Sequence, residues 1–438
     1  MNNISCLLLR LILFAGLILP ATVVKADTTV EIDGLTYTIV PTTRTATVTS
    51  YSSSLPADVT IPSTVTYNEM EMTVTAIADK AFTNCTKLVS ISIPATVTQV
   101  GTVSVDTNGT GESLPFYGCT SLKRVRFEDG KQSISLGARL YPGHYENNRI
   151  WYFKEGYGLF YTCPLEEVYI GRIITYKDLS YTNEYARPAK MTVSSNPQYF
   201  GYSAFYNKSK LAKVTISSSV TVIPPYLFYK NSSLTTIELP KVQYIRVGAF
   251  QECSKLTTLN FGTDLVTVDD SAFEGCKNVT KLTFPNTTTT IGTGAFKDCC
   301  SLVEITVGSG LKTIGANAFR NCSSFTALVA PDNFTRMDSA AFYGCKKLTV
   351  AKLGKSLTAV PAEAFYDCIA LSEVDIPATA TSIGNKAFCN DSTLAVVTMR
   401  EGLKTIGDEV FWNNSGITKF TIPSTVKSIG ANCFYGCI

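Results

Sequence analysis

Apolar residues recur along this chain in a pattern that repeats about every 23 residues. Phenylalanine marks the phase, and of the ten steps between eleven successive copies nine are 23 residues and one is 22. These copies are Phe205, Phe228, Phe250, Phe273, Phe296, Phe319, Phe342, Phe365, Phe388, Phe411 and Phe434. Apolar residues follow each phenylalanine at fixed offsets, as in Leu302, Ile305, Val307, Leu311 and Ile314. Self-similarity at a fixed period indicates a repeat architecture rather than independent globular domains.

The first apolar group of each copy predicts a short β-strand. Ile305 and Val307 are two residues apart, so both side chains lie on one face of a strand while Thr306 faces outward. Proline often follows, as at Pro331, and ends the strand because it has no backbone N–H. The A-F-x-x-C phrase then predicts a short helical or turn-like return. One such coil cannot bury its apolar side alone, so we expect stacked coils with a parallel sheet on one face and a shared core.

Three earlier phenylalanines, Phe82, Phe116 and Phe160, carry the same phrase with insertions between the copies. The whole chain therefore predicts a repeat solenoid of about fourteen coils. We expect repeats with long aromatic-rich insertions over residues 55–204 and regular 23-residue repeats over residues 205–438.

The pattern A-F-x-x-C-x-x-L-x-x-V-x-I-P-x-x-V-x-x-I-G resembles the BspA-like leucine-rich repeat, a family of surface proteins in Bacteroides- and Treponema-type bacteria and some parasitic protists. The resemblance covers roughly residues 55–438. It implies a leucine-rich-repeat arc. The stretch VEIDGLTYTIV at 30–40 resembles the short β-hairpin that opens many such arrays, so residues 27–54 are expected to form an N-terminal β-hairpin cap. The resemblance also implies adhesion, because relatives are discussed as binders of extracellular matrix proteins.

The first residues of the chain predict export. An apolar run from Leu11 to about Leu19 is followed by small residues, and Val24 and Ala26 stand where a signal peptidase reads its substrate. We therefore expect residues 1–26 to be a signal peptide, which makes the protein secreted or attached to the cell surface. Only Arg10 precedes the apolar run as a basic residue, so a retained membrane anchor is the alternative. No later segment is long and apolar enough to span a bilayer.

Fourteen cysteines in an exported chain raise the question of disulfides. Ten of them occupy one slot, three residues after phenylalanine, where the other coils place Lys208, Asn231, Asp391 and Asn414. A disulfide partner cannot be replaced by asparagine, whereas a small polar group bonded to local backbone can. We interpret the slot as a row of mostly free, buried thiols. Stacked slots could approach bridging distance, so an occasional disulfide remains an alternative. A metal site is disfavoured, because side chains in one row cannot surround an ion.

Candidate catalytic chemistry is sparse. The single histidine, His144, lies in an insertion, and no phosphate-binding glycine loop or G-x-S-x-G sequence occurs. Glu373 and Asp375 form the closest carboxylate pair on an outward strand face, where alternating lysines indicate a solvated surface rather than a glycosidase site. We therefore expect no enzymatic activity and no cofactor.

The predicted outward strand positions form a row that could bind a macromolecule. The row is Ser92, Arg126, Tyr169, Thr215, Glu238, Asn260, Thr283, Thr306, Val329, Lys352, Asp375, Thr398 and Thr421. Threonine-rich, mildly charged faces suit protein or glycan ligands, although threonine is also simply a good strand former. The formal net charge is +3 at pH 7 and the basic residues are not clustered, so nucleic acid is not an expected partner.

The insertions are rich in aromatic residues, which are enriched at recognition sites. The candidate ligand-binding residues are Tyr145, Trp151, Tyr152, Tyr157, Tyr169, Tyr176, Tyr181 and Tyr185. The same rings could instead only pack the insertions onto the coils. The leading hypothesis is a monomeric, exported binding module for an extracellular protein or glycan. The alternative is a passive structural or envelope spacer without a specific ligand.

Overall fold

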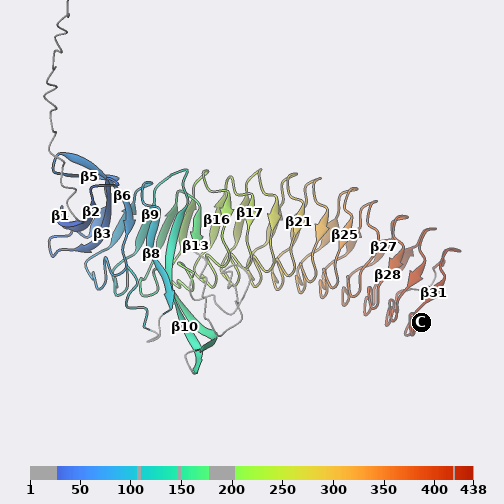
Figure 1. Ribbon diagram of the computed structural model, residues 1–438. Coiled ribbons are helices and arrows are strands. Elements are labelled where there is room, and N and C mark those ends of the chain that lie inside the picture. Colours follow the sequence, from blue (N-terminus) through green and yellow to red (C-terminus); the bar gives the residue numbers. More distant parts are fainter. Residues whose placement is uncertain (1–26, 106–109, 147–148, 177–202, 418–419, 438) are drawn as a thin grey trace, which may run out of the picture.

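The chain forms one elongated solenoid, whose coils follow one another from the blue to the red end in Figure 1. The computed structural model describes residues 27–105, 110–146, 149–176, 203–417 and 420–437, and at residues 105, 140–146 and 149–156 it describes the backbone alone. Each coil has three sides, of which two are strands and the third is a turn. The predicted solenoid with parallel strands is confirmed.

The first apolar group of each coil lies on a strand of what we call the main ladder. Its members are β4 (Asp58–Thr60), β7 (Ser90–Ile93), β9 (Arg124–Phe127), β12 (Glu167–Ile170), β14 (Lys213–Ile216), β16 (Thr236–Leu239), β18 (Thr258–Phe261), β20 (Lys281–Thr283), β22 (Glu304–Thr306), β24 (Ala327–Val329), β26 (Val350–Lys352), β27 (Glu373–Asp375) and β29 (Val396–Thr398). Paired neighbours are parallel and in register, so that Ala327, Val350 and Glu373 stand side by side. Equivalent residues of successive coils therefore form columns.

The second apolar pair of each coil forms a second parallel ladder of very short strands. Its members are β15 (Val222–Ile223), β17 (Tyr244–Ile245), β19 (Thr267–Val268), β21 (Thr290–Ile291), β23 (Thr313–Ile314), β25 (Arg336–Met337), β28 (Ser382–Ile383), β30 (Thr405–Ile406) and β31 (Ser428–Ile429). In most of these strands the second residue is buried. The sequence identified these apolar positions, and the structure shows that they are strands.

On the N-terminal side of the second ladder, the strands belong to a larger sheet. β1 (Thr28–Ile32), β2 (Leu35–Val40) and β3 (Thr45–Tyr51) pair antiparallel in that order, with a turn at Asp33 and Gly34. β3 then pairs in parallel with β6 (Met70–Ile77), which also pairs antiparallel with β5 (Thr64–Tyr67) and in parallel with β8 (Gln99–Val105). The expected hairpin at residues 30–40 is therefore part of a three-stranded unit that joins the sheet.

The insertion after Phe127, to which the sequence analysis assigned no secondary structure, forms strands. β10 (Ile134–Glu146) pairs in parallel with β8 and with β13 (Ile174–Tyr176), and then pairs antiparallel with β11 (Arg149–Gly158). The far part of β10 and β11 projects from the solenoid as a hairpin arm (Figure 1). The register shifts of β10 against β11 interrupt a regular alternation, and the other partners of β10 are distant in sequence, so the local pattern did not predict these strands.

The returns that carry the A-F-x-x-C phrase are turns, and no described residue is helical. In the turn around Phe82 and in those from Phe228 to Phe434, two backbone positions adopt positive φ, one two residues before phenylalanine and one two residues after it. Asn317 and Asn321 fill these positions around Phe319, with φ of 56° and 60°. Glycine and asparagine tolerate this region best, which accounts for the many Gly, Asn and Asp residues directly before cysteine.

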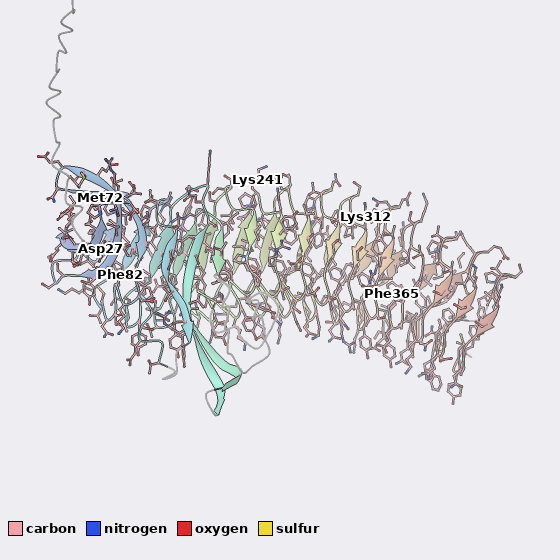
Figure 2. All side chains as sticks on the ribbon, in the orientation of Figure 1. Asp27, Met72, Phe82, Lys241, Lys312 and Phe365 are labelled. Carbon is pink, nitrogen blue, oxygen red and sulfur yellow. The ribbon has the colours of Figure 1, made fainter. Side chains whose placement is uncertain are left out.

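The phenylalanine rings form one stacked column through the core. Successive ring centroids lie 5.1–5.7 Å apart from Phe82 to Phe434. Phe82 and Phe365, near the two ends, lie on the same side of the coils, whereas Lys241 and Lys312 lie along the opposite edge (Figure 2). Backbone hydrogen bonds between neighbouring coils keep the same spacing. For example, the Phe296 amide donates to the Ala318 carbonyl of the next coil at 2.8 Å.

The cysteine slot behaves as the sequence interpretation predicts. From Cys119 onward, each slot thiol donates to the carbonyl of the phenylalanine one coil earlier, as Cys322 Sγ does to Phe296 O at 3.3 Å. The described slot cysteines are free, and burial raises their pKa, to about 12 for Cys253 and Cys163. Asn231 makes the equivalent contact, because its Nδ2 donates to Phe205 O at 2.9 Å.

Lys208 and Asp391 are the charged residues in this slot. Lys208 Nζ donates to Phe160 O at 2.5 Å, and burial lowers its pKa to about 8. Asp391 Oδ1 accepts the Cys368 amide at 2.7 Å, whereas Asp391 Oδ2 has no hydrogen-bond partner among the described residues. Burial raises the pKa of Asp391 well above its ordinary range, and nearby Asp367 adds to the effect. A neutral carboxyl fits this position best.

The phenylalanine column makes a first prediction. Replacing Phe296 by alanine removes a ring that stacks on Phe273 and Phe319, at 5.3 and 5.4 Å, and leaves a cavity. We expect the free energy of unfolding, measured by urea titration, to fall by about 3–5 kcal/mol. The exposed Thr306→Ala variant in the same coil is the control and should change it by no more than about 0.5 kcal/mol. Equal losses for the two variants would contradict the stacked core.

The buried carboxyl makes a second prediction. The pKa of Asp391 is higher in the folded chain than in the unfolded chain. The contribution of the neutral carboxyl to stability is therefore complete below the unfolded pKa, about 3.9, and is lost as the pH rises through the folded pKa. Stability should fall by up to about 1.4 kcal/mol per pH unit in that window. Asp391→Asn should remove this loss, so that the variant is increasingly more stable than the parent as pH rises. Thermal unfolding of both proteins between pH 4 and 8 measures this difference in stability. A difference between variant and parent that stays constant at all pH values would contradict the prediction.

Candidate functional site: a groove on the strand face

The outward side chains of the main ladder form a continuous surface, which we call the strand face. Each strand contributes two outward positions, such as Lys281 and Thr283 on β20, on either side of an inward apolar residue. The parallel register aligns these positions into two columns along the solenoid. The strand face therefore has the same backbone geometry in every coil, and its chemistry varies only with the residues at the two outward positions.

In the N-terminal and middle parts of the strand face, acidic and basic side chains form ion pairs with each other. Arg124 pairs with Asp58 at 3.0 Å, and Lys281 pairs with Glu304 at 2.9 Å. The Lys213 ammonium likewise pairs with Glu167 on the neighbouring strand. These pairs are exposed, so each contributes about 0–1 kcal/mol to stability. They leave little unpaired charge for a ligand.

Over β24 to β29 the strand face changes to exposed valines. Val329, Val350 and Val396 are 55, 40 and 49 % exposed at outward positions where other coils place threonine or charged residues. Single exposed apolar residues are ordinary on protein surfaces, but Val329 and Val350 lie on neighbouring strands, and such a group makes this part of the strand face a candidate contact surface. Their beta-branched side chains suit the strand and add nothing to the core.

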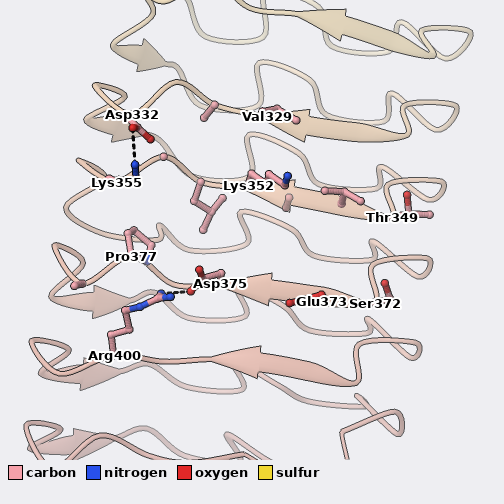
Figure 3. A pocket seen from close by; sticks show the side chains of 16 residues that line it. Val329, Asp332, Thr349, Lys352, Lys355, Ser372, Glu373, Asp375, Pro377 and Arg400 are labelled. Atoms are coloured by element: carbon pink, nitrogen blue, oxygen red, sulfur yellow. Dashed lines mark hydrogen bonds and ion pairs between the residues drawn. The ribbon is translucent and has the colours of Figure 1, made fainter.

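A groove of about 780 Å³ runs across these strands and is drawn in Figure 3. Val329 and Val350 line it from two neighbouring strands, together with Thr349 and Ser372. Two ion pairs lie toward one edge. One joins Lys355 Nζ to Asp332 Oδ2 at 2.7 Å, and the other joins Arg400 to Asp375.

Beneath the groove, one inward residue of the core is smaller than its counterparts on the neighbouring strands. β26 points Ala351 inward, where the neighbouring strands point Leu328 and Val374. One coil earlier, Phe325 stands where most other regular coils place leucine, and its ring lies 6.3 Å from that of Phe319 and 6.0 Å from that of Phe342. Ala351 itself lines the groove, so the hollow lies over the smallest inward residue.

Two charged residues of the groove are without an ion pair among the described residues, Lys352 on β26 and Glu373 on β27. Lys352 stands beside Asp375 in the strand register, but the Asp375 carboxylate is engaged by Arg400. Glu373 stands beside Val350 and Val396. Both side chains are exposed. The groove therefore offers one positive and one negative charge, each one strand beyond a valine of its own column: Lys352 beyond Val329, and Glu373 beyond Val350.

The groove has no arrangement suited to catalysis. Of the carboxylate pair considered from sequence, Asp375 is held by Arg400 and both side chains lie on one strand, so they do not face each other across a cleft. Within the described residues no cluster of His, Cys, Asp and Glu side chains could hold a metal ion. The described part of the chain also contains no helix with the length and hydropathy needed to cross a bilayer.

The aromatic candidates from sequence do not converge on one place. Tyr145, Trp151 and Tyr152 lie on the hairpin arm of β10 and β11, where only the backbone is described. Tyr181 and Tyr185 lie outside the described residues.

The remaining three candidates contact the coils. Tyr157 is buried, with its ring 4.6 Å from that of Tyr161. Tyr176 is half-buried at an inward position of β13, and burial raises its pKa to about 12. Tyr169 is on the strand face. Its hydroxyl donates to Asp129 Oδ2 at 2.7 Å and its ring lies under the Arg126 guanidinium.

Sequence reasoning singled out Glu373 and Asp375 only as a carboxylate pair, named Val329 and Lys352 in the outward row without singling them out, and omitted Val350, Val396 and Arg400. The missing signal was present in the sequence. The outward position eight residues after phenylalanine carries Lys, Thr or Glu in several regular coils and valine at 350 and 396. The hollow itself depends on packing between coils, which the pattern within one coil does not contain.

Comparison with known proteins agrees with this architecture. A family model described as BspA type leucine rich repeat region matches residues 60–138, 154–280, 222–349 and 312–438. A leucine-rich repeat protein from Bacteroides ovatus is 24% identical, with a TM-score of 0.53, and the match covers 93% of this chain and 92% of that one. A leucine rich cell surface protein from Faecalibacterium prausnitzii is 21% identical, with a TM-score of 0.38, over 93% and 95% of the two chains.

The comparison with curated proteins gave no match. The family model nevertheless covers most of the solenoid, including all of its regular coils, and the repeat phrase, the phenylalanine column and the parallel ladders agree with it. The chain belongs to the BspA-type leucine-rich repeat family.

Proposed function

We propose that the chain is an exported, non-catalytic binding module of adhesin type that engages an extracellular protein or glycan through its strand face. The observation that carries the proposal is the groove over β24 to β29, where exposed valines and two unpaired charges replace the self-neutralised lattice of the other coils. These residues do not serve the core, so a binding role explains their presence better than a structural one.

Export rests on the sequence of residues 1–26, which lie outside the described part of the chain. Attachment to the cell surface or release into the medium both place the strand face where a host or microbial macromolecule can reach it. The arm of β10 and β11 is a second candidate contact, because it projects from the solenoid and carries Tyr145, Trp151 and Tyr152 in its sequence (Figure 1).

A passive spacer is the competing function. The paired charges of the N-terminal and middle strand face favour it, since they give a surface with little to offer a ligand. The spacer hypothesis gives no reason for the change of chemistry at β24.

The binding proposal is tested with the purified chain on immobilised extracellular matrix proteins and on a glycan array. We expect at least one macromolecule to bind, and Val350→Asp to weaken that binding about tenfold or more, because a carboxylate would have to be desolvated in the contact. The matched control is Thr258→Asp, at the equivalent outward position of β18, which should bind as the parent does. Binding of nothing on either surface would support the spacer.

The arm is tested separately. Replacing residues 142–154 by Asn-Gly joins Tyr141 to Glu155, which are cross-strand partners, and so removes the arm while keeping the pairing of β10 with β8. Weaker binding by this variant with unchanged binding by Val350→Asp would move the contact from the groove to the arm.

A further inference from the structure

We propose that the groove takes an extended segment of a partner protein, in which an apolar side chain is flanked by one acidic and one basic residue. This inference rests on the proposed binding function and specifies its ligand. It follows from three properties of the groove: the nature of its walls, its unpaired charges and its length.

The walls favour an aliphatic or aromatic side chain of a peptide over a sugar ring. None of the side chains that line the groove is aromatic, so it lacks the flat rings on which sugars stack. Val329 and Val350 instead expose methyl groups beside the small side chain of Ala351. Covering such a surface stabilises a complex by about 25 cal/mol for each Å² of apolar area removed from water.

The charges specify what flanks the apolar residue. Asp332 and Asp375 are already paired with Lys355 and Arg400, whereas Lys352 and Glu373 have no ion pair among the described residues. Lys352 belongs to the outward column of Val329, and Glu373 belongs to the other column, beside Val350. An acidic group of the ligand is therefore expected at Lys352 and a basic group at Glu373. Complementary charges of this kind determine register and specificity more than affinity.

The length of the groove agrees with a short peptide. Its lining residues come from the coils of β24, β26 and β27 and from Arg400, just after β29. Four neighbouring strands about 4.8 Å apart span about 15 Å, which is the length of four to five residues of extended chain. The backbone groups of β26 are already used in pairing with β24 and β27, so recognition has to come from side chains.

A second copy of the chain is the main rival occupant, because Lys352 of one copy could meet Glu373 of the other across a two-fold axis. Its strand face, however, would present the same hollow, and two hollows placed face to face do not fill each other. The experiment below separates the two occupants.

The probe is a library of random decapeptides displayed on phage and selected on the immobilised full chain. We expect enrichment of an apolar residue with an acidic residue on one side and a basic residue on the other. The double variant Lys352→Glu with Glu373→Lys should enrich the same motif with the two charges exchanged. The single variants should weaken binding of the parent-selected peptides about tenfold, and Val350→Asp should abolish their enrichment.

The matched control is Lys281→Glu with Glu304→Lys, which exchanges a pair that is already neutralised on the same face. It should enrich the same peptides as the parent. No enrichment by the parent chain, or enriched peptides that bind all variants equally, would overturn the peptide assignment. Sedimentation at increasing concentration tests the rival. Self-association lost in each single reversal and restored in the double variant would replace the peptide by a second copy.

The adhesin-type function and the assignment of the groove to a peptide would be contradicted by different results. If a matrix protein or glycan binds the chain but ignores Lys352, Glu373 and Val350, the binding function stands and the groove assignment is wrong. If the charge-exchanged motif is selected but no natural macromolecule binds, the groove assignment stands and the adhesin-type function is wrong.

Discussion

The structure depends on the stacking of one phenylalanine ring per coil on the ring of the next. The rings lie 5.1–5.7 Å apart, close to the roughly 4.8 Å spacing of paired β-strands, so the column and the two ladders can share one rise per coil. Any coil that lost this spacing would break the ladder bonds and the thiol contacts together. This explains why the core positions repeat almost without variation while the outward positions do not.

Because the core, the turns and the slot make their contacts inside the solenoid, the outward strand positions carry little of the stability. They are consequently free to vary, and in most coils they hold threonine or paired charges. At β24 to β27 they instead form a hollow with exposed valines over the small inward residue Ala351. The strand face can therefore change its chemistry locally while the core columns continue unchanged.

Much of the architecture could be predicted from the sequence, because a period of 23 aligns Phe, Cys and Pro in every coil. The thiol slot was also predictable, since Asn231 and Asn414 stand in for cysteine at the same position. The strands of the insertion were not, because the partners of β10, on β8 and β13, are distant in sequence and the pairing is bulged. The groove was missed for a related reason. It is formed by side chains from several neighbouring coils, whereas the pattern describes one coil at a time.

The most direct measurement is hydrogen–deuterium exchange of the chain with and without the macromolecule that it binds. If the strand face carries recognition and the columns carry the fold, added protection should be concentrated in residues 326–332, 349–355 and 372–378, with the turns around the phenylalanines unchanged. Added protection confined to the turns or to the arm of β10 and β11 would contradict this division between the core and the strand face.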